Sequence, residues 1–422
     1  MLMSEPIFGR DVQEGSPRGP RENEAGEQAT FLMEMAASLS TYGSPADRVE
    51  DVMEYCARDM GLAGQFFSLP TAVYATLGEG WDARTYLRRV PIVSVNLSRL
   101  VALDGIMQSV AAHTMTVRDA TVAMREVERT PRPFGIRWAI GASAVCSGSI
   151  APLFGGGLRE VIGATAIGGI VILLEQIGKV RPEARRVLDF LAGLVAAVIA
   201  AAITGLLGPI ATQAVIISGL IGLMPGLTVT MAMKELSTVN LVAGTSRLVG
   251  ALMILVSIAF GVAVGQRIGA HIPAVAGEIG PALPAWVEHV ALLLGASTLA
   301  ILFQARPRDI PAMVATGAIG YYGAVASGLA LGEEIGACVG AFLVGVTSNL
   351  LARIVNRPAA VTMVPGIILL VPGSVGYVSI SAFMSDNAMA GVETAFRMIL
   401  IAAALATGLL LANVAAPPKR AL

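Results

Sequence analysis

From residue 131 onward, the chain is a succession of apolar stretches, each long enough to cross a lipid bilayer. A transmembrane helix needs about 20 consecutive, mostly apolar residues. The ten stretches lie near 137–154, 159–177, 187–207, 210–232, 241–265, 286–304, 310–331, 334–354, 361–383 and 391–414. The pattern predicts a polytopic α-helical membrane protein, because a soluble protein this apolar could not cover its own surface with polar groups.

The charged residues are concentrated in the first 130 positions, which hold 12 Arg and 18 Asp or Glu. The other 292 residues hold only 29 of the 59 charged side chains. The formal net charge of −1 gives no reason to expect a nucleic-acid partner. With three Cys, three His and no phosphate-binding loop, the chain predicts neither a metal site nor a cofactor.

These shifts in composition divide the chain into six segments. The predicted segments are a disordered tail (1–28), a small cytoplasmic α/β domain (29–130), a first five-helix repeat (131–270), an extracytoplasmic linker (271–285), a second five-helix repeat (286–415) and a cytoplasmic tail (416–422). The first segment is polar and has no apolar core, so it does not read as a signal peptide.

The α/β domain is predicted from helix caps and short β-like runs. Ser44 is expected to cap a helix that has Pro45 at its first position, with Asp47 completing the cap. Thr116 and Asp119 predict a second cap of this kind. The expected strands are 66–69, 72–77 and 86–93, and further helices are expected over 96–111 and 117–128. No catalytic motif is visible here, which indicates that the chain is not an enzyme.

The two sets of five apolar stretches are related in sequence. A shift of 147 positions lays the LMPG of 223–226 on the LVPG of 370–373, and Asn240 on Asn387. A nearly constant offset with the order preserved predicts an internal duplication. Because five is odd, the second copy must cross the membrane in the opposite sense to the first. We therefore expect an inverted-topology repeat, an architecture common in secondary transporters.

The cations outside the stretches agree with this topology. A shift of 149 positions lays Glu160 on Asp309. If the α/β domain is cytoplasmic, thirteen Lys or Arg residues fall on the inside, and only Arg159 and Arg267 fall outside. This is a strong positive-inside bias, and it predicts that both termini are cytoplasmic.

Two of the stretches contain a Pro-Gly break, at Pro225-Gly226 in the first half and at Pro372-Gly373 in the second. Thr228 and Ser374 follow the breaks. Interrupted helices at matching positions of two repeats are the best sequence indication of a transporter site. A simple proline kink in a packed helix is the alternative.

Arg247 and Arg397 are the two cations inside the stretches. A charge there is costly unless it is paired or hydrated, which makes each arginine a candidate for substrate binding. Glu175 is the expected partner of Arg247. The expected partner of Arg397 is Glu393, which lies four residues before it. Snorkelling of each arginine to the lipid headgroups is the alternative.

Three carboxylates are candidates for proton coupling, namely Glu175, Asp189 and Glu393. Glu175 and Asp189 flank the basic loop 178–186, so they can also be read as solvated helix ends. Four small residues at a spacing of four are instead expected to be structural, as a ridge for close helix packing. They are Gly193, Ala197, Ala201 and Gly205.

Three sequences carry a resemblance to a known family. They are Gly43-Ser44-Pro45-Ala46-x-x-Val49-Glu50, LIGLMPGLTVTMAMKELSTVNLVAGTSRL at 220–248 and VPGIILLVPG at 364–373. Together with the order of the modules, they resemble the bacterial threonine/serine exporter family over nearly the whole chain from residue 29. The resemblance implies proton-driven export of small hydroxy amino acids across the inner membrane. Split two-protein relatives are associated with dicarboxylate export, which stays open as an alternative.

The function predicted from the sequence is export of threonine and serine from the cytoplasm, by proton antiport. The expected partners are a small amino acid, protons and the lipid bilayer, and a homo-oligomer is left open. A membrane-bound enzyme acting through its soluble domain, and a channel or scaffold, are the other hypotheses. The expected substrate contacts are Pro225, Gly226, Thr228, Asn240, Arg247, Pro372, Gly373, Ser374, Asn387 and Arg397.

Overall fold

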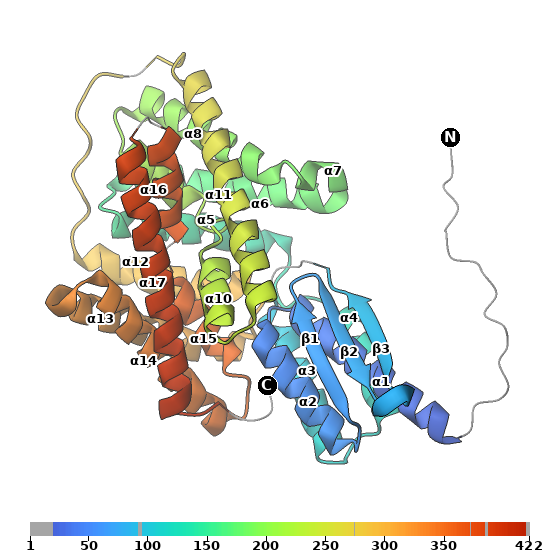
Figure 1. Ribbon diagram of the computed structural model, residues 1–422. Coiled ribbons are helices and arrows are strands. Elements are labelled where there is room, and N and C mark those ends of the chain that lie inside the picture. The colour runs from blue at the N-terminus through green and yellow to red at the C-terminus, as the bar shows by residue number, and fades with distance from the viewer. Residues whose placement is uncertain (1–19, 92–94, 274, 372, 385–386, 419–422) are drawn as a thin grey trace, which may run out of the picture.

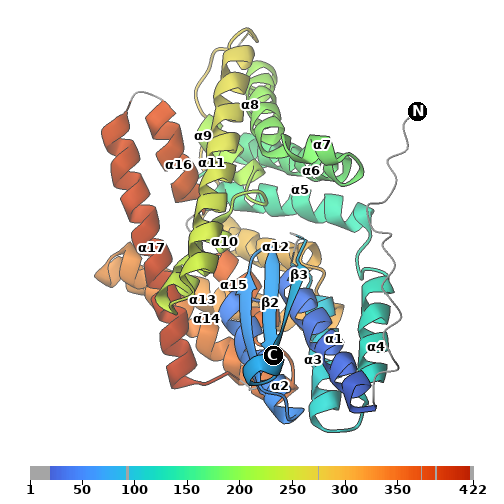
Figure 2. The ribbon, with the colours of Figure 1, turned by 45° about the vertical axis from the view of Figure 1, so that its right-hand side comes forward.

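The computed structural model describes residues 20–91, 95–273, 275–371, 373–384 and 387–418. An N-terminal unit, which contains the only sheet in this part of the chain, lies at one end of the molecule. The remaining helices form a second, larger body beside it (Figures 1 and 2). This arrangement agrees with a polytopic helical membrane protein that carries a small α/β unit in front.

The N-terminal unit contains four long helices and three strands. They are α1 (Pro20–Thr41), α2 (Ala46–Asp59), β1 (Gly64–Leu69), β2 (Ala72–Leu77), β3 (Arg84–Arg89), α3 (Leu97–Ala111) and α4 (Val117–Arg129), with a short 3₁₀ turn, η1 (Gly80–Asp82), before β3. The sheet is antiparallel in the order β1-β2-β3, with Tyr74 opposite both Phe67 and Leu87. Alternate residues of β2, including Val73 and Ala75, are buried against the helices.

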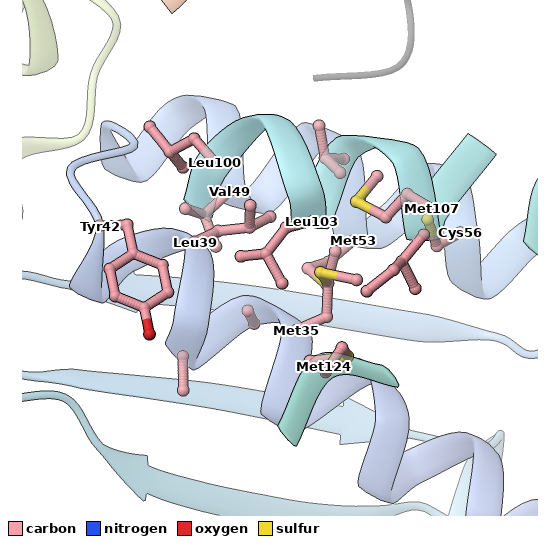
Figure 3. Packing of buried hydrophobic residues seen from close by; sticks show 14 of the residues in the cluster. Met35, Leu39, Tyr42, Val49, Met53, Cys56, Leu100, Leu103, Met107 and Met124 are labelled. Atoms are coloured by element: carbon pink, nitrogen blue, oxygen red, sulfur yellow. The ribbon is translucent and has the colours of Figure 1, made fainter. Parts of the chain in front are cut away.

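The core of the unit is formed by apolar side chains at helical spacing. Figure 3 shows Leu39 of α1, Val49 of α2 and Leu103 of α3 directed toward one another, and Met124 comes from α4. Leu39 and Val49 are fully buried. The same cluster continues into the helical body through Met313 and neighbouring residues. The two parts therefore share one hydrophobic core.

Two predictions for this unit are wrong. Helix α1 begins at Pro20, so residues 20–28 are helical rather than part of a tail; residues 1–19 lie outside the described residues. Proline is well suited to the first position of a helix, which explains where α1 begins. Ser44 does not cap α2, because Pro45 occupies the N-cap position and makes no side-chain cap. The Thr116 cap is confirmed, since its Oγ1 accepts from Asp119 N at 3.1 Å.

The helical body follows the ten predicted stretches closely. Its helices are α5 (Ile136–Leu153), α6 (Leu158–Val180), α7 (Pro182–Arg185), α8 (Leu188–Leu207), α9 (Thr212–Gly219), α10 (Gly226–Ser237), α11 (Leu241–Gly269), α12 (Trp286–Leu302), η2 (Pro307–Asp309), α13 (Ile310–Leu331), α14 (Glu333–Val355), α15 (Ala360–Ile368), α16 (Gly373–Met384) and α17 (Ala388–Ala415). Among the described residues, seven segments are long and apolar enough to cross a membrane. Three of the ten predicted stretches are not among these seven segments. They are α5, α12, which has 17 residues, and the interrupted pair α9 and α10.

The predicted ridge of small residues packs α8 against α11. A Cβ added to Gly193 would lie 2.3 Å from the carbonyl oxygen of Ile258, and one added to Gly265 would lie 2.4 Å from that of Leu194. Backbones approach this closely only where side chains are absent.

We expect Gly193→Ala to lower the free energy of unfolding by about 1–3 kcal/mol, because the new methyl group overpacks the contact between α8 and α11. Gly250→Ala is the matched control, since Gly250 lies on α11 with nothing within 4 Å of an added Cβ. Thermal unfolding in detergent micelles measures both variants. Equal stability of the two would contradict the close contact.

Both halves of the helical body contain a buried acid at the start of their second helix. Glu160 in α6 accepts from Gly157 N and from Ala211 N, each at 2.8 Å, and Ala211 is the N-cap of α9. Asp309, the N-cap of α13, forms an ion pair with Arg357, which lies just before α15. In each half, a carboxylate therefore joins the start of the second helix to the start of the interrupted one.

The N-terminal unit is also joined to the helical body by backbone hydrogen bonds. Leu97 N and Ser98 N donate to the carbonyl oxygens of Phe303 and Gln304, at 3.0 and 3.2 Å. The side chain of Gln304 bonds the backbone of Phe134 through both its amide nitrogen and its oxygen. These bonds fix the unit to the end of α12 and to the segment that leads into α5.

Candidate functional site

Both interrupted helices break at the predicted positions. The first consists of α9 and α10, which are separated by a turn over residues 220–225 with Pro225 as the N-cap of α10. The second consists of α15 and α16, which are separated by residues 369–372. Pro372 lies outside the described residues. Pro225 lacks the N–H that a continuous helix would need, so the polypeptide leaves α9 and starts α10 as a second half-helix.

The two breaks lie against each other at their glycines. A Cβ added to Gly226 would lie 1.9 Å from Val371 Cγ1 and 2.9 Å from Gly373 N. A Cβ added to Gly373 would lie 3.2 Å from Met224 Cβ and 3.4 Å from Gly226 Cα. Only glycine permits backbones to pass at this distance. We call this contact of Met224 and Gly226 with Val371 and Gly373 the crossing.

The half-helices α10 and α16 both start at the crossing, and both views place α16 above α10 (Figures 1 and 2). The first backbone N–H groups of a helix have no partner within it, and its N-terminus carries a partial positive charge. Two such ends at one place favour a bound carboxylate. The two halves also pack against each other here, since α10 of the first half contacts α17 of the second, and α16 of the second half contacts α11 of the first.

Four hydroxyl groups follow the crossing in two different environments. Thr230 Oγ1 donates to Gly226 O at 3.2 Å, and Ser379 Oγ donates to Gly391 O at 2.8 Å. These two buried groups are used inside the helix packing. Thr228 and Ser374 lie in the first turns of α10 and α16 and are half-buried. They are the hydroxyl groups that a ligand at the crossing would meet first.

Arg247 is paired, but with Glu235 rather than with Glu175. Its Nε lies 3.0 and 2.9 Å from the two carboxylate oxygens of Glu235, a residue of α10 that is fully buried. Glu235 Oε1 also accepts from Ala46 N at 3.0 Å, and Ala46 is the first residue of α2. The carboxylate therefore caps α2 from the helical body, which is why Ser44 is not needed as a cap.

The neighbouring residue of α10 makes a second ion pair with the N-terminal unit. Lys234 Nζ donates to Asp47 Oδ2 at 2.8 Å, and both side chains are mostly buried. Nine residues of helix separate Gly226 from Glu235, a distance of about 14 Å along the axis. The two ion pairs therefore lie at the far end of α10 from the crossing.

Arg397 pairs with Glu333, the first residue of α14, and not with Glu393. Both side chains of this pair are about half exposed or more. Glu393 is exposed on α17. The expected pairing within α17 is therefore wrong, because a carboxylate from another helix reaches the guanidinium.

The two predicted asparagines lie at equivalent places, as N-caps of the last helix of each half. Asn240 precedes α11, and its amide lies 3.5 Å from Thr238 Oγ1. Asn387 precedes α17, and its Oδ1 accepts from Ala390 N at 3.3 Å. Neither position belongs to the crossing; both lie at helix starts, where the Asn387 side chain caps α17 and the Asn240 side chain makes no cap.

Glu175 and Asp189 are half-buried and lie near the turn that joins α6 to α8. They are not part of the crossing. Among the described residues, no group of three or more His, Cys, Asp or Glu is placed to hold a metal ion.

Glu235 is the functional candidate that sequence reasoning missed. It falls just past the end of the expected stretch 210–232, where an acid reads as a solvated helix end. The Lys-Glu pair at 234–235, twelve residues before an intramembrane arginine, is the signal that could have identified it. Its bond to Ala46 has no sequence signal, because 189 positions separate the two residues.

Two family models match the chain. Residues 30–269 match a model described as "Putative threonine/serine exporter". Residues 288–415 match a model described as "Threonine/Serine exporter, ThrE". Together the matches include both helix breaks, Arg247 and Arg397, and the N-terminal unit from residue 30 onward.

Similar curated proteins come from fungi. "Pheromone-regulated membrane protein 10" of Debaryomyces hansenii is 26% identical over 403 residues, covering 87% of this chain and 37% of that protein. The protein of the same name in Candida albicans is 26% identical, covering 83% of this chain and 33% of its own length. An uncharacterised protein of Schizosaccharomyces pombe is also 26% identical, covering 87% and 45%. The chain thus spans a third to less than half of these relatives. No solved structure matches it.

Proposed function

Because the chain belongs to the threonine/serine exporter family, we propose that it exports threonine and serine across a membrane in exchange for protons. The observation that carries this proposal is the crossing, where two interrupted helices from the two halves meet through Gly226 and Gly373. Transporter sites built from discontinuous helices place half-helix ends toward their substrate.

The crossing offers chemistry that suits a small hydroxy amino acid. The substrate carboxylate is held by the N-termini of α10 and α16. The helices α9 and α15 end at the breaks, so the carbonyl oxygens of their last turns are not all used within a helix. These oxygens accept from the ammonium group. Thr228 and Ser374, in the first turns, read the side-chain hydroxyl. Pro225, the N-cap of α10, keeps the first break open.

Two observations support an inverted repeat as the scaffold of this site. Glu160 and Asp309, which the sequence aligns, each tie the second helix of a half to its interrupted helix. Asn240 and Asn387, also aligned, each precede the last helix of a half. Alternating access would then open the crossing to one side at a time.

Arg247 and Arg397 lie at the two ends of the pathway in this proposal. Each is held by a carboxylate, Glu235 in one case and Glu333 in the other. A substrate carboxylate arriving at either end competes for the guanidinium, which favours bidentate contacts. The substrate would thus contact one arginine before it reaches the crossing and the other after it leaves the crossing.

Proton coupling is assigned to acids outside the crossing. Glu175 near the end of α6 and Asp189 at the start of α8 both lie near the turn that joins these helices, and Glu393 lies on α17. A carboxylate that alternates between two sides can carry a proton in one direction while the substrate moves in the other. Export by a Glu175→Gln variant should then lose its dependence on the proton gradient.

The proposed location is a cell membrane, with several passes and with both termini in the cytoplasm. The fungal relatives are named as membrane proteins. Location in the bacterial inner membrane and assembly into a homo-oligomer are predictions from the sequence.

The function is tested in cells that are fed a threonine dipeptide, which they hydrolyse to threonine. We expect cells that express the chain to release threonine several-fold faster than control cells, and an uncoupler to remove the difference. Release that ignores the uncoupler would contradict proton coupling. Release of dicarboxylates in place of threonine and serine would favour the dicarboxylate exporter, and release of none of these compounds would contradict the proposal.

A further inference from the structure

Three arginines from two connections of the second half meet where its membrane helices end. Arg306 and Arg308 lie in the connection between α12 and α13, and Arg357 lies in the connection between α14 and α15. Arg357 forms an ion pair with Asp309, whose backbone N donates to Arg306 O at 2.9 Å. The ion pair therefore holds the two connections together. We call Arg306, Arg308 and Arg357 the arginine cluster.

The arginine cluster carries more positive charge than the carboxylate beside it balances. Asp309 supplies one negative charge, which Arg357 takes, and its side chain is only 7% exposed. In the described part of the chain, the side chains of Arg306 and Arg308 make no hydrogen bond or ion pair. Burial lowers the pKa of the Arg306 guanidinium, which is half-buried, and the charge of Arg308 lowers that pKa further. Like charges held this close favour a bound anion.

The first half shows how an arginine at the corresponding position is satisfied. The shift of 149 positions that lays Glu160 on Asp309 also lays Arg159 on Arg308. Arg159 Nη1 lies 3.3 Å from Pro209 O and 3.4 Å from Glu278 O, so it donates to two carbonyl oxygens of the chain. A guanidinium has five N–H donors. Arg308 is exposed and has no such acceptor among the described residues, so its donors are open to another molecule.

The surroundings of the arginine cluster are those of a lipid headgroup. Helix α14, which is long and apolar enough to cross a membrane, ends two residues before Arg357. The last two residues of α14, Ile354 and Val355, are 80% and 49% exposed. Apolar side chains exposed at the end of a membrane helix face acyl chains, and guanidinium groups just beyond that end reach the level of the phosphates.

We propose that the arginine cluster binds the phosphate of an anionic phospholipid, in the leaflet that faces the N-terminal unit. Guanidinium groups hold phosphate oxygens in bidentate contacts, and basic sites between membrane helices bind such headgroups. The acyl chains lie along the end of α14, against Ile354 and Val355. The bound phosphate joins the connection before α13 to the connection before α15, as the pair of Asp309 and Arg357 also does. This site goes beyond the proposed export function and does not depend on it.

The test compares two variants that lose the same charge. Arg306→Gln with Arg308→Gln removes two charges from the arginine cluster. Arg132→Gln with Arg137→Gln, the control, removes two exposed arginines before and in the first turn of α5, which the sequence places on the same side of the membrane. The full chain in neutral detergent micelles is titrated with phosphatidylglycerol or with phosphatidylcholine. Native mass spectrometry counts the bound lipid, and thermal unfolding is measured in the same micelles.

We expect the wild-type chain and the control variant to bind phosphatidylglycerol on the order of tenfold more tightly than phosphatidylcholine. In the cluster variant, the two affinities should lie within about twofold of each other. Without phosphatidylglycerol, the cluster variant should unfold at no lower temperature than wild type, because it lacks two of the charges that repel one another. With phosphatidylglycerol, wild type should become the more stable of the two. This change of order separates lost binding from failed folding.

An equal preference for phosphatidylglycerol in the two double variants would overturn the site, because net charge alone would then explain the binding. Inorganic phosphate that stabilises the wild-type chain as much as phosphatidylglycerol does would overturn the lipid as its ligand. Lipid binding is measured without transport, so a chain that exports neither threonine nor serine contradicts the proposed function and leaves this site standing.

Discussion

Replacing Gly226 with alanine is expected to reduce threonine export to the background of control cells. The added Cβ would lie 1.9 Å from Val371 Cγ1 and 2.9 Å from Gly373 N, so the two half-helices can no longer meet. Overpacking of this kind forces backbone shifts, and a shift of about 1 Å in a positioned site can cost 100-fold in rate. Export from cells and the amount of inserted protein measure the effect together.

The control for this variant is Gly222→Ala. Gly222 lies in the same turn, but nothing is within 4 Å of an added Cβ. It should export at close to the wild-type rate. Adding Val371→Ala to Gly226→Ala removes the closest clash and leaves the backbone contacts, so we expect partial recovery. Export by Gly226→Ala that matches Gly222→Ala would exclude the crossing as the transport site.

Removal of the Glu235 carboxylate is expected to cause the largest loss of stability. Glu235→Ala leaves the guanidinium of Arg247 without its partner and leaves the N–H of Ala46 without its cap. Breaking a buried ion pair on one side costs about 3–5 kcal/mol. Glu235→Gln keeps an acceptor for Ala46 but not the charge, so its loss should be intermediate.

The control is the other arginine pair. Glu333 and Arg397 are 66% and 49% exposed, so Glu333→Ala should cost no more than about 1 kcal/mol. Thermal unfolding in detergent micelles measures stability, and limited trypsin digestion of the N-terminal unit reports its release from the helical body. Equal losses for Glu235→Ala and Glu333→Ala would contradict the role of Glu235 as the buried link.

The helices of this protein are largely predictable from its sequence, because each apolar stretch is an independent local signal. The ten expected stretches coincide with α5, α6, α8 to α17, and both helix breaks fall at the Pro-Gly positions. The Thr116 cap was also predictable, since its partner Asp119 is three residues away. Local chemistry decides features of this kind.

The partners of the charged residues on the helices were not predictable. Arg397 has a carboxylate four residues before it in the chain, yet it pairs with Glu333, 64 positions away. Ser44 has the sequence of a helix cap, yet the carboxylate of Glu235 takes that role across 189 positions. Both choices depend on how the helices pack, and helix packing in a membrane leaves only weak traces in a single sequence.

The candidate site was only partly predictable, because the helix breaks have a local sequence signal and the contact between them has none. The sequence identifies two breaks and their glycines, and an offset of 147 positions relates them. It does not state that Gly226 and Gly373 touch, or that Asn240 and Asn387 lie at helix caps away from them. The two asparagines share a position before the last helix of each half, and only Asn387 caps that helix with its side chain.

The central claim is that threonine and serine leave the cell through the crossing, and efflux from proteoliposomes tests it most directly. Vesicles that contain the purified chain and are loaded with radiolabelled threonine should lose label several-fold faster than empty vesicles. Excess unlabelled serine inside should slow the loss of label, and Gly226→Ala should restore the slow rate of empty vesicles. A wild-type chain that releases threonine no faster than empty vesicles would contradict the account.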